Sequence, residues 1–181
     1  PSPHYRFTLL VAHLKSKRPV PEADQAEMRE EEARLLRGII DARLKADPTL
    51  NLVVLGDLND TPDSSSTQTV RGPGPARDMS YEEKKAMWDV VLYSTFRIAL
   101  ERSPTLHTHI HDGERDILDH ILVSEEFFTR NPARLGQVAR HEVINDHLRE
   151  DESDAPVPGC SDHGVPIAEI QLLTDSRHTN P

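Results

Sequence analysis

The sequence contains one cysteine, Cys160, which excludes an intrachain disulfide and a cysteine-rich zinc site. No apolar run approaches the roughly 18 residues of a membrane-spanning helix, and the visible start has no signal-peptide pattern. These absences favour a cytoplasmic protein without a membrane span. Aromatic residues make up 4% of the chain and hydrophobic residues 36%, so the core must come from a few short apolar runs.

Positive charge is also scarce, with 21 lysines and arginines against 31 acidic residues and a net charge of -10. This balance argues against a general nucleic-acid-binding surface, because affinity for a duplex depends largely on cations that neutralise phosphates. A local basic patch could still bind nucleic acid with the help of metal ions. The segment from His13 to Arg18 is the candidate, because it also contains Lys15 and Lys17.

The length of 181 residues predicts one domain, over residues 1–174, followed by a disordered tail at 175–181. The chain begins at Pro1 and enters the first predicted strand almost at once, so we expect the native N-terminus to lie elsewhere. Alternation and short apolar runs predict strands at Tyr5–Ala12, Leu52–Leu55, Ile117–Val123, Gln137–Ile144 and Val165–Leu173. The run Leu52–Leu55 is apolar throughout, which is typical of a central strand covered on both faces.

Helical periodicity predicts a long amphipathic helix at Glu22–Ala46 and a second helix at Ser80–Leu100. The apolar stripe of the first comprises Met28, Leu35, Leu36, Ile39, Ile40 and Leu44. Residues Thr61–Arg77, rich in Pro, Ser, Thr and Gly, indicate a loop, and Asp112-Gly113 indicates a hairpin that joins 107–111 to 117–123. The mixture of elements predicts an α/β fold.

Four segments place polar side chains next to short apolar runs: VAHLKSK (Val11–Lys17), VVLGDLND (Val53–Asp60), LDHILVS (Leu118–Ser124) and SDHGVP (Ser161–Pro166). They supply the carboxylates, imidazoles and amides that metal-assisted phosphodiester cleavage needs. Hard oxygen ligands suit Mg²⁺, or Mn²⁺ in its place. A carboxylate that accepts from a histidine ring fixes its tautomer and raises its basicity, so we expect Asp119 and His163 to pair.

These ordered motifs resemble the endonuclease/exonuclease/phosphatase superfamily, which includes DNase I-like nucleases, abasic-site endonucleases, inositol polyphosphate phosphatases and neutral sphingomyelinases. The pattern is His13, then Gly-Asp-x-Asn with Asp57 and Asn59, then Asp119 before a strand, then Ser-Asp-His ending at His163. The resemblance implies the C-terminal part of a two-sheet α/β sandwich with flanking helices. It also implies a phosphodiester or phosphomonoester substrate, which could be a nucleic acid.

The resemblance further implies a role for each matching residue. His13 and Asn59 would contact the phosphate, with Lys15 nearby, and Asp57 would orient or deprotonate the attacking water. Asp119 would orient His163, which would hydrogen-bond to the phosphate or the nucleophile. Asp162, with Asp57, would contribute to the metal site, and His120 is interpreted as a structural or rim residue.

The family's metal-binding Glu and an Asn precede the first motif in its members, and nothing upstream of Tyr5 can supply them. Three explanations stay open: a fragment, strands contributed by another polypeptide or a second copy, or a reduced and inactive protein. The alternative to a phosphodiesterase or nuclease is therefore a noncatalytic binding or assembly module. We expect the helix carboxylates to be solvated rather than metal-binding: Glu22, Glu27, Glu30, Glu31 and Glu32.

Two further clusters are interpreted as structural. His107, His109 and His111 would share one face of a strand and could chelate a transition metal, but polar residues on an open strand face need no ligand. The acidic residues Asp146, Asp151, Glu152 and Asp154 lack the spacing of a calcium loop, which favours a solvated loop.

Overall fold

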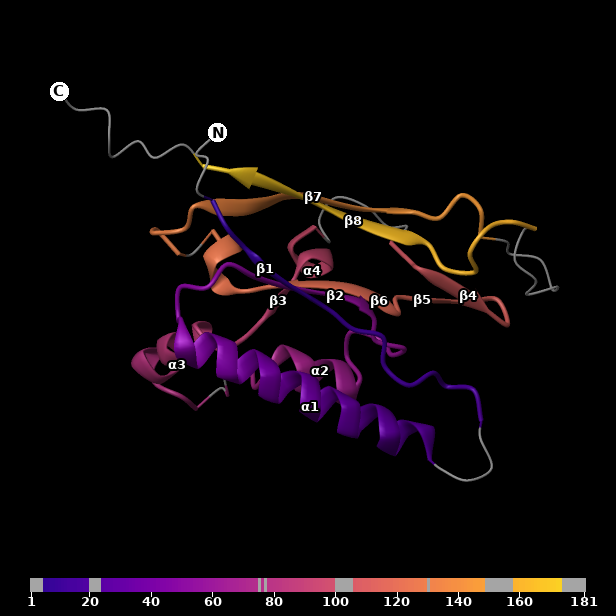
Figure 1. Ribbon diagram of the computed structural model, residues 1–181, viewed down its shortest axis with the longest axis horizontal. Coiled ribbons are helices and arrows are strands. Elements are labelled where there is room, and N and C mark those ends of the chain that lie inside the picture. Colours follow the sequence, from indigo (N-terminus) through magenta and orange to yellow (C-terminus); the bar gives the residue numbers. More distant parts are fainter. Residues whose placement is uncertain are drawn as a thin grey trace.

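A computed structural model describes residues 5–19, 24–74, 76, 78–99, 106–129, 131–148 and 158–173. The described part of the chain forms three layers (Figure 1). Three of the described helices cover one face of a central sheet, and a two-stranded sheet lies over the other face, with a short helix at Thr95–Ala99 between the two sheets. The predicted α/β fold is confirmed. The predicted tail at 175–181 lies outside the described residues.

The central sheet has the strand order β1-β2-β6-β3. Strand β1 (Thr8–Val11) runs parallel to β2 (Leu52–Asp57), and β6 (Asp119–Val123) pairs antiparallel with both β2 and β3 (Tyr93–Ser94). The carboxyl ends of β1 and β2 therefore lie beside the amino end of β6. This edge of the sheet collects the polar motifs.

Strand β2 is buried on both faces, as its continuous apolar run predicts. Leu52 and Val54 belong to the core between the sheet and the helices, whereas Val53 belongs to the core between the two sheets. The second core also contains Phe127, from a 3-10 turn at Glu125–Phe127. Burial on both faces makes β2 a rigid support for the residues that follow it.

Helix α1 (Gln25–Ala46) begins after Asp24, whose carboxylate caps the backbone N–H of Ala26 and Glu27. The predicted apolar stripe is only partly correct. Leu36, Ile40 and Leu44 pack on the sheet with Ala33, but the exposed fractions are 71% for Leu35, 50% for Ile39 and 38% for Met28. One face of a single helix cannot bury so wide a stripe against a single sheet.

Two helix predictions need correction. Residues 61–77 contain helix α2 (Ser65–Arg71), because Ser64 caps it through the backbone N–H of Thr67. The single helix predicted at 80–100 is instead helix α3 (Tyr81–Trp88), strand β3 and helix α4 (Thr95–Ala99). The chain leaves α3 so that Leu92 can enter the core, where its N–H donates to the carbonyl of Arg71.

The predicted hairpin has the wrong partner. Strand β4 (His109–His111) pairs with the short strand β5 (Glu114–Asp116), and β6 pairs with β2 and β3 instead. The apolar side chains of β6 explain the difference, because they are buried only in the centre of a sheet. Strands β7 (Gly136–Ile144) and β8 (Val165–Leu172) form the second sheet and match their predictions.

Within the described residues, no helix combines the length and apolar character needed to cross a bilayer.

Candidate active site

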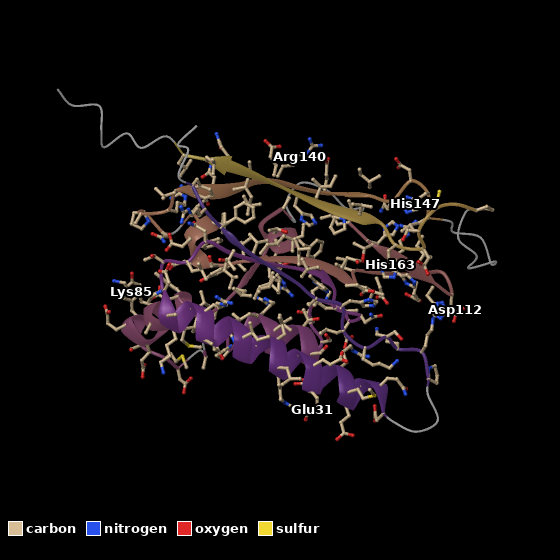
Figure 2. The ribbon with its side chains drawn as sticks, viewed as in Figure 1. Glu31, Lys85, Asp112, Arg140, His147 and His163 are labelled. Atoms are coloured by element: carbon tan, nitrogen blue, oxygen red, sulfur yellow. The ribbon has the colours of Figure 1, made fainter. Side chains whose placement is uncertain are left out.

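The four polar motifs meet at one edge of the two sheets. Asp57, at the end of β2, is the direct register partner of Asp119, at the start of β6. His13 follows β1, and His163 precedes β8 and forms an isolated antiparallel bridge with His109. Figure 2 shows His163 where the hairpin β4–β5 meets the beginning of β8. Strand order and register therefore bring together residues that are distant in the sequence.

A carboxylate–imidazole–carboxylate arrangement lies at the centre of this edge. The Nδ1–H of His163 donates to Oδ2 of Asp119 at 2.7 Å. Because a carboxylate only accepts, this bond fixes the tautomer with a proton on Nδ1. The Nε2 atom then faces the opposite way and lies 3.9 Å from Oδ2 of Asp57.

His13 lies on the open side of this group, with its Nε2 3.6 Å from Oδ2 of Asp57. Its side chain is 73% exposed, so an incoming anion can reach it from solvent. The backbone of Lys15 is held to helix α1: its N–H donates to Glu32 and its carbonyl accepts from Arg29. Glu32 is thus half-buried and used by the fold, contrary to the expectation that it is merely solvated.

Asn59 is 8% exposed and adopts a left-handed backbone with φ of 53°. Asparagine tolerates this conformation better than most residues. Its N–H donates to Oδ1 of Asp57 at 2.8 Å, and its side-chain Nδ2 donates to the carbonyl of Leu14 at 2.9 Å. Asn59 therefore joins the segment that carries His13 to the loop that carries Asp57.

The surroundings of Asp57 and His163 shift the pKa of both side chains upwards. The pKa of Asp57 is raised, first by burial and then by the nearby Asp119 carboxylate, although the N–H of Asn59 opposes the shift. The pKa of His163 is also raised, first by its hydrogen bond to Asp119. A carboxylate with a raised pKa is a stronger base than an ordinary one, and an imidazole with a raised pKa keeps its proton more readily, so the pair offers a proton acceptor and a proton donor.

Thr108 is a supporting residue that sequence reasoning missed. It is buried, and its hydroxyl oxygen accepts from the N–H groups of Leu118 and Asp119 at 3.0 and 3.1 Å. Its carbonyl accepts from the N–H of Gly164 at 2.7 Å. One residue therefore fixes the two segments that carry Asp119 and His163.

Asp60 and Arg29 form a second supporting pair that the sequence did not reveal. Arg29 is 6% exposed, and its Nε donates to Oδ2 of Asp60 at 3.0 Å. Ser66 donates to the same oxygen, and Lys17 lies 3.6 Å from Oδ1. The carbonyl of Asp60 accepts from Nε2 of the buried His120, which agrees with the structural interpretation of that histidine.

The ionised side chain of Asp60 is expected to stabilise the fold by an amount that depends on pH. Burial alone would raise its pKa, but hydrogen bonds from Ser66 and Arg29 outweigh burial and lower it. We expect Asp60→Asn to reduce the free energy of unfolding at pH 7 by about 2 kcal/mol, since Arg29 loses its buried partner and solvent screens part of the effect. Because the folded-state pKa is lowered, the contribution is present above the unfolded-state value and is lost as pH falls through the folded-state value.

Urea unfolding at pH 7 and pH 3 measures this effect. Glu31→Gln is the control, because Glu31 pairs with Arg34 on the exposed face of α1 and should change stability by about 0.5 kcal/mol at most. An Asp60→Asn variant no less stable than Glu31→Gln at pH 7 would contradict the supporting role.

Two groups of side chains among the described residues could hold a metal ion. Asp57, Asp119 and His163 form one group, and His109, Asp162 and His163 form the other. The two predicted metal ligands, Asp57 and Asp162, thus fall into different groups that share His163. The paired carboxylates of the first group fit Mg²⁺ or Mn²⁺, which prefer oxygen ligands.

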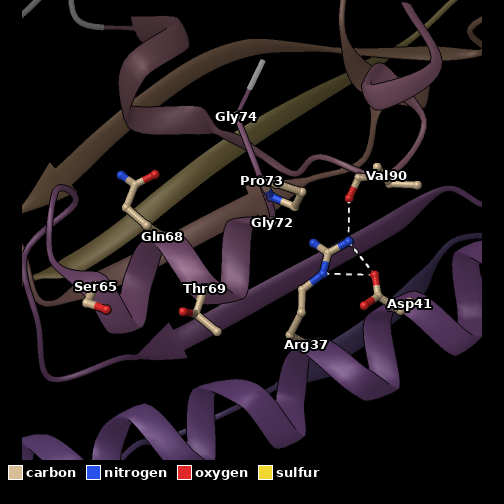
Figure 3. Close-up of a pocket in the computed structure, with 9 residues that line it drawn as sticks. All are labelled: Arg37, Asp41, Ser65, Gln68, Thr69, Gly72, Pro73, Gly74 and Val90. Atoms are coloured by element: carbon tan, nitrogen blue, oxygen red, sulfur yellow. Dashed lines mark hydrogen bonds and ion pairs between the residues drawn. The ribbon is translucent and has the colours of Figure 1, made fainter. Parts of the chain in front are cut away.

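A pocket of about 580 Å³ lies elsewhere, between α1, α2 and the segment that precedes β3 (Figure 3). None of its described lining residues belongs to the cluster around His163. Arg37 occupies its wall and donates to the carbonyl of Val90 and to Asp41. The Arg37 guanidinium therefore has hydrogen-bond partners within the fold, and we interpret it as a structural residue of the pocket wall.

Comparison with known proteins agrees with the resemblance inferred from the motifs. A family profile described as "Endonuclease/Exonuclease/phosphatase family" matches residues 4–158. The chain belongs to this family. The match covers three of the four motifs, and the structure brings the fourth, Ser161–Pro166, to the same edge. A search of curated proteins gave no match.

Three solved structures share the fold of this chain. A mannosyl-6-phosphatase of Bacteroides thetaiotaomicron VPI-5482 superposes with a TM-score of 0.53 at 18% identity over 93% of this chain. An endonuclease/exonuclease/phosphatase family protein of the same species gives 0.53 and 18% over 97%. A conserved protein of unknown function from Enterococcus faecalis V583 gives 0.50 and 16% over 92%. The chain spans only 51%, 51% and 50% of their respective lengths.

Proposed function

We propose that the chain carries the histidine–carboxylate part of the active site of a metal-dependent phosphoester hydrolase. The observation that carries the proposal is the alignment of Asp119, His163 and Asp57, with a hydrogen bond of 2.7 Å on one side of the imidazole and a carboxylate 3.9 Å away on the other. This alignment leaves Nε2 of His163 and the Asp57 carboxylate facing a common space. An attacking water and a phosphate oxygen fit the chemistry of that space.

In this proposal Asp57 orients and deprotonates the water, because its raised pKa brings a carboxylate closer to the basicity that the step needs. His163 donates from Nε2 to a phosphate oxygen when both of its ring nitrogens are protonated, which its raised pKa favours, and Asp119 keeps its ring in place. His13, Lys15 and Asn59 bind the phosphate. A bound Mg²⁺ or Mn²⁺ would be held by the group that contains Asp57 and Asp119, not by Asp57 together with Asp162, and would polarise the phosphate and stabilise the leaving oxygen.

The finer proposal is a phosphodiester substrate, including nucleic acid. It rests on the local basic segment beside His13, where Lys17 and Arg18 are exposed in a chain of net charge -10. A phosphodiester carries groups on both sides of the phosphate, and such a segment can bind the flanking phosphates of a polymer. The relative described as a mannosyl-6-phosphatase makes phosphomonoesters the alternative.

The experiment is metal-dependent hydrolysis of bis-p-nitrophenyl phosphate, p-nitrophenyl phosphate and plasmid DNA. We expect Mg²⁺ or Mn²⁺ to be required and the diester to be preferred. Preference for the monoester would overturn the phosphodiesterase proposal and leave the hydrolase proposal standing. The same test applies to a polypeptide that also contains the other half of the fold. If it neither binds Mg²⁺ nor hydrolyses any of the three substrates, the noncatalytic module is favoured.

We also propose that the other half of the two-sheet fold completes the metal site and covers apolar surface left open here. Strand β1 is the edge of the central sheet, where Val11 is 70% exposed, and Phe7, directly before the strand, is 57% exposed. Strand β8 exposes Val165 at 52%. Exposed edges and apolar strands invite pairing with another chain.

The isolated chain is therefore expected to self-associate, with a second copy in place of the other half. Light scattering after size exclusion should show a dimer or larger species, and Val11→Lys should shift it towards monomer. The control is Tyr81→Lys on α3, which removes an equally exposed apolar residue far from β1. A strictly monomeric wild-type chain would contradict this prediction.

A further inference from the structure

The second metal-binding group differs in chemistry from the first. His109, Asp162 and His163 supply two imidazoles and one carboxylate, with ligand atoms that all lie within 4.8 Å of one another. We propose that these three residues form a zinc site at the rim of the active site, and that bound Zn²⁺ removes His163 from the proposed hydrolytic chemistry.

The backbone places the two histidines side by side. His109 and His163 face each other across an isolated antiparallel bridge, and their ring centroids are 4.9 Å apart at an interplanar angle of 51°. The N–H of Gly164 donates to the carbonyl of Thr108 at 2.7 Å and fixes the bridge. Side chains opposite each other in such a pair have Cβ atoms about 5 Å apart, close enough to share one ion.

The tautomer of His163 fits metal binding. Its Nδ1–H is donated to Asp119, so its Nε2 lone pair is available to a metal. A histidine that binds a metal almost always donates its other ring N–H to a carboxylate or carbonyl, which fixes the ring and raises its basicity. Asp119 would therefore orient His163 towards zinc in the same way as towards a phosphate.

The ligand types select the ion. Two imidazoles and a carboxylate suit Zn²⁺ and similar transition metals, whereas Mg²⁺ prefers oxygen ligands and retains several waters. Asp162 is exposed and completes the set from the solvent side.

Zinc at this position would compete with the proposed reaction. It would take Nε2 of His163, which otherwise faces Asp57, the carboxylate of the magnesium-binding group. The same imidazole cannot donate to a phosphate while it binds a metal. Zinc and magnesium should therefore act in opposite directions on one site.

Zinc binding is measured by adding Zn²⁺ alone to the 181-residue chain. One readout is competition against a chromophoric chelator, and the other is NMR of the histidine rings. His109→Ala is expected to weaken zinc binding by about tenfold or more, because loss of even an outer-shell partner costs about 10–100-fold in metal affinity. His111→Ala is the matched control: His111 lies two residues further along β4 with a 68% exposed side chain, and binding should stay unchanged. The resonances of His109 and His163 should both shift with zinc.

Asp57→Asn separates the two metal groups. If Asp57→Asn weakens zinc binding and His109→Ala does not, zinc occupies the group of Asp57, Asp119 and His163, and the proposal is wrong. Absence of zinc binding by the wild-type chain also overturns it. These binding measurements need no hydrolysis, so they stand even if the proposed function fails.

The activity measurement adds an independent result. Where Mg²⁺ supports hydrolysis, added Zn²⁺ should inhibit it, and His109→Ala should relieve the inhibition while keeping the Mg²⁺-supported rate. Hydrolysis that is insensitive to zinc in the wild type would overturn the proposed effect, while the proposed function would remain.

Discussion

Replacing His163 with alanine is expected to lower kcat for metal-dependent phosphoester hydrolysis by about 10²–10⁴-fold, the usual contribution of a positioned acid or base. The imidazole is held by Asp119 at 2.7 Å, and its Nε2 lies 3.9 Å from Asp57, so alanine removes a donor whose position is fixed by the fold. KM should change much less than kcat, because the lost interaction belongs to the transition state. The measurement is steady-state hydrolysis of bis-p-nitrophenyl phosphate with Mg²⁺.

Two variants separate catalysis from folding. His111→Ala removes an exposed histidine of the neighbouring hairpin and should leave kcat unchanged. Asp119→Asn keeps the shape of the side chain but removes its charge and leaves a neutral amide oxygen, which accepts more weakly from His163 than the carboxylate that first raises the pKa of His163. The pKa of His163 should therefore fall in this variant, and the limb of the pH–rate profile that reports it should move to lower pH.

NMR titration of the His163 ring checks this shift in the chain itself, without any turnover. A loss of kcat below tenfold in His163→Ala would contradict the catalytic role. A His163 pKa that stays the same or rises in Asp119→Asn would contradict the positioning role of Asp119.

The residues proposed for the site could be named from the sequence because each lies at or beside one end of a strand: His13, Asp57 and Asn59 at or after the end of one, and Asp119 and His163 at or before the start of one. An apolar strand and the polar residue after it are visible locally, and antiparallel pairing of β2 with β6 then sets Asp57 opposite Asp119. The Ser-Asp-His tripeptide likewise precedes a strand. Local patterns thus name such residues, and the family's order of motifs relates them to one another.

The supporting residues could not be predicted in the same way. Arg29 is one of many charged residues in α1, and only its burial beside Asp60 distinguishes it. Thr108 looks like an ordinary residue between two histidines until its hydroxyl is seen to accept from the N–H of Asp119. Such roles depend on tertiary contacts between different segments of the chain. These contacts produce no periodic pattern or motif spacing in the sequence.

The mistaken elements have a similar cause. The predicted helix at 80–100 breaks because Leu92 gains more from burial in the core than from continuing an exposed helix. The apolar run of β6 competes for a central position between β2 and β3, and this outweighs the hairpin with 107–111 that the Asp112-Gly113 turn favours. Burial decides between alternatives that are equally good locally.

Gly56→Ala is expected to lower the free energy of unfolding by about 3 to 5 kcal/mol, the combined cost of overpacking and of an unfavourable backbone. Gly56 has φ of +135°, and a Cβ built on it would lie 1.9 Å from the carbonyl oxygen of Ala12. The obstacle is backbone, held by hydrogen bonds from Ala12 N–H to Leu55 and from Leu14 N–H to Asp57, both at 3.0 Å. Strand β1 can move away from the added methyl group only if these backbone hydrogen bonds to β2 break.

Urea unfolding measures the effect, and Gly38→Ala is the matched control. Gly38 lies in α1 with nothing within 4 Å of an added Cβ, so alanine there should stabilise the chain by about 1 kcal/mol through helix propensity. Because β1 delivers His13 next to Asp57, Gly56→Ala should also move His13 away, which an altered His13 ring resonance would report. If the free energy of unfolding of Gly56→Ala lies within about 1 kcal/mol of the wild-type value, β1 does not pack this closely on β2. That result would also contradict the position of His13 in the proposed site.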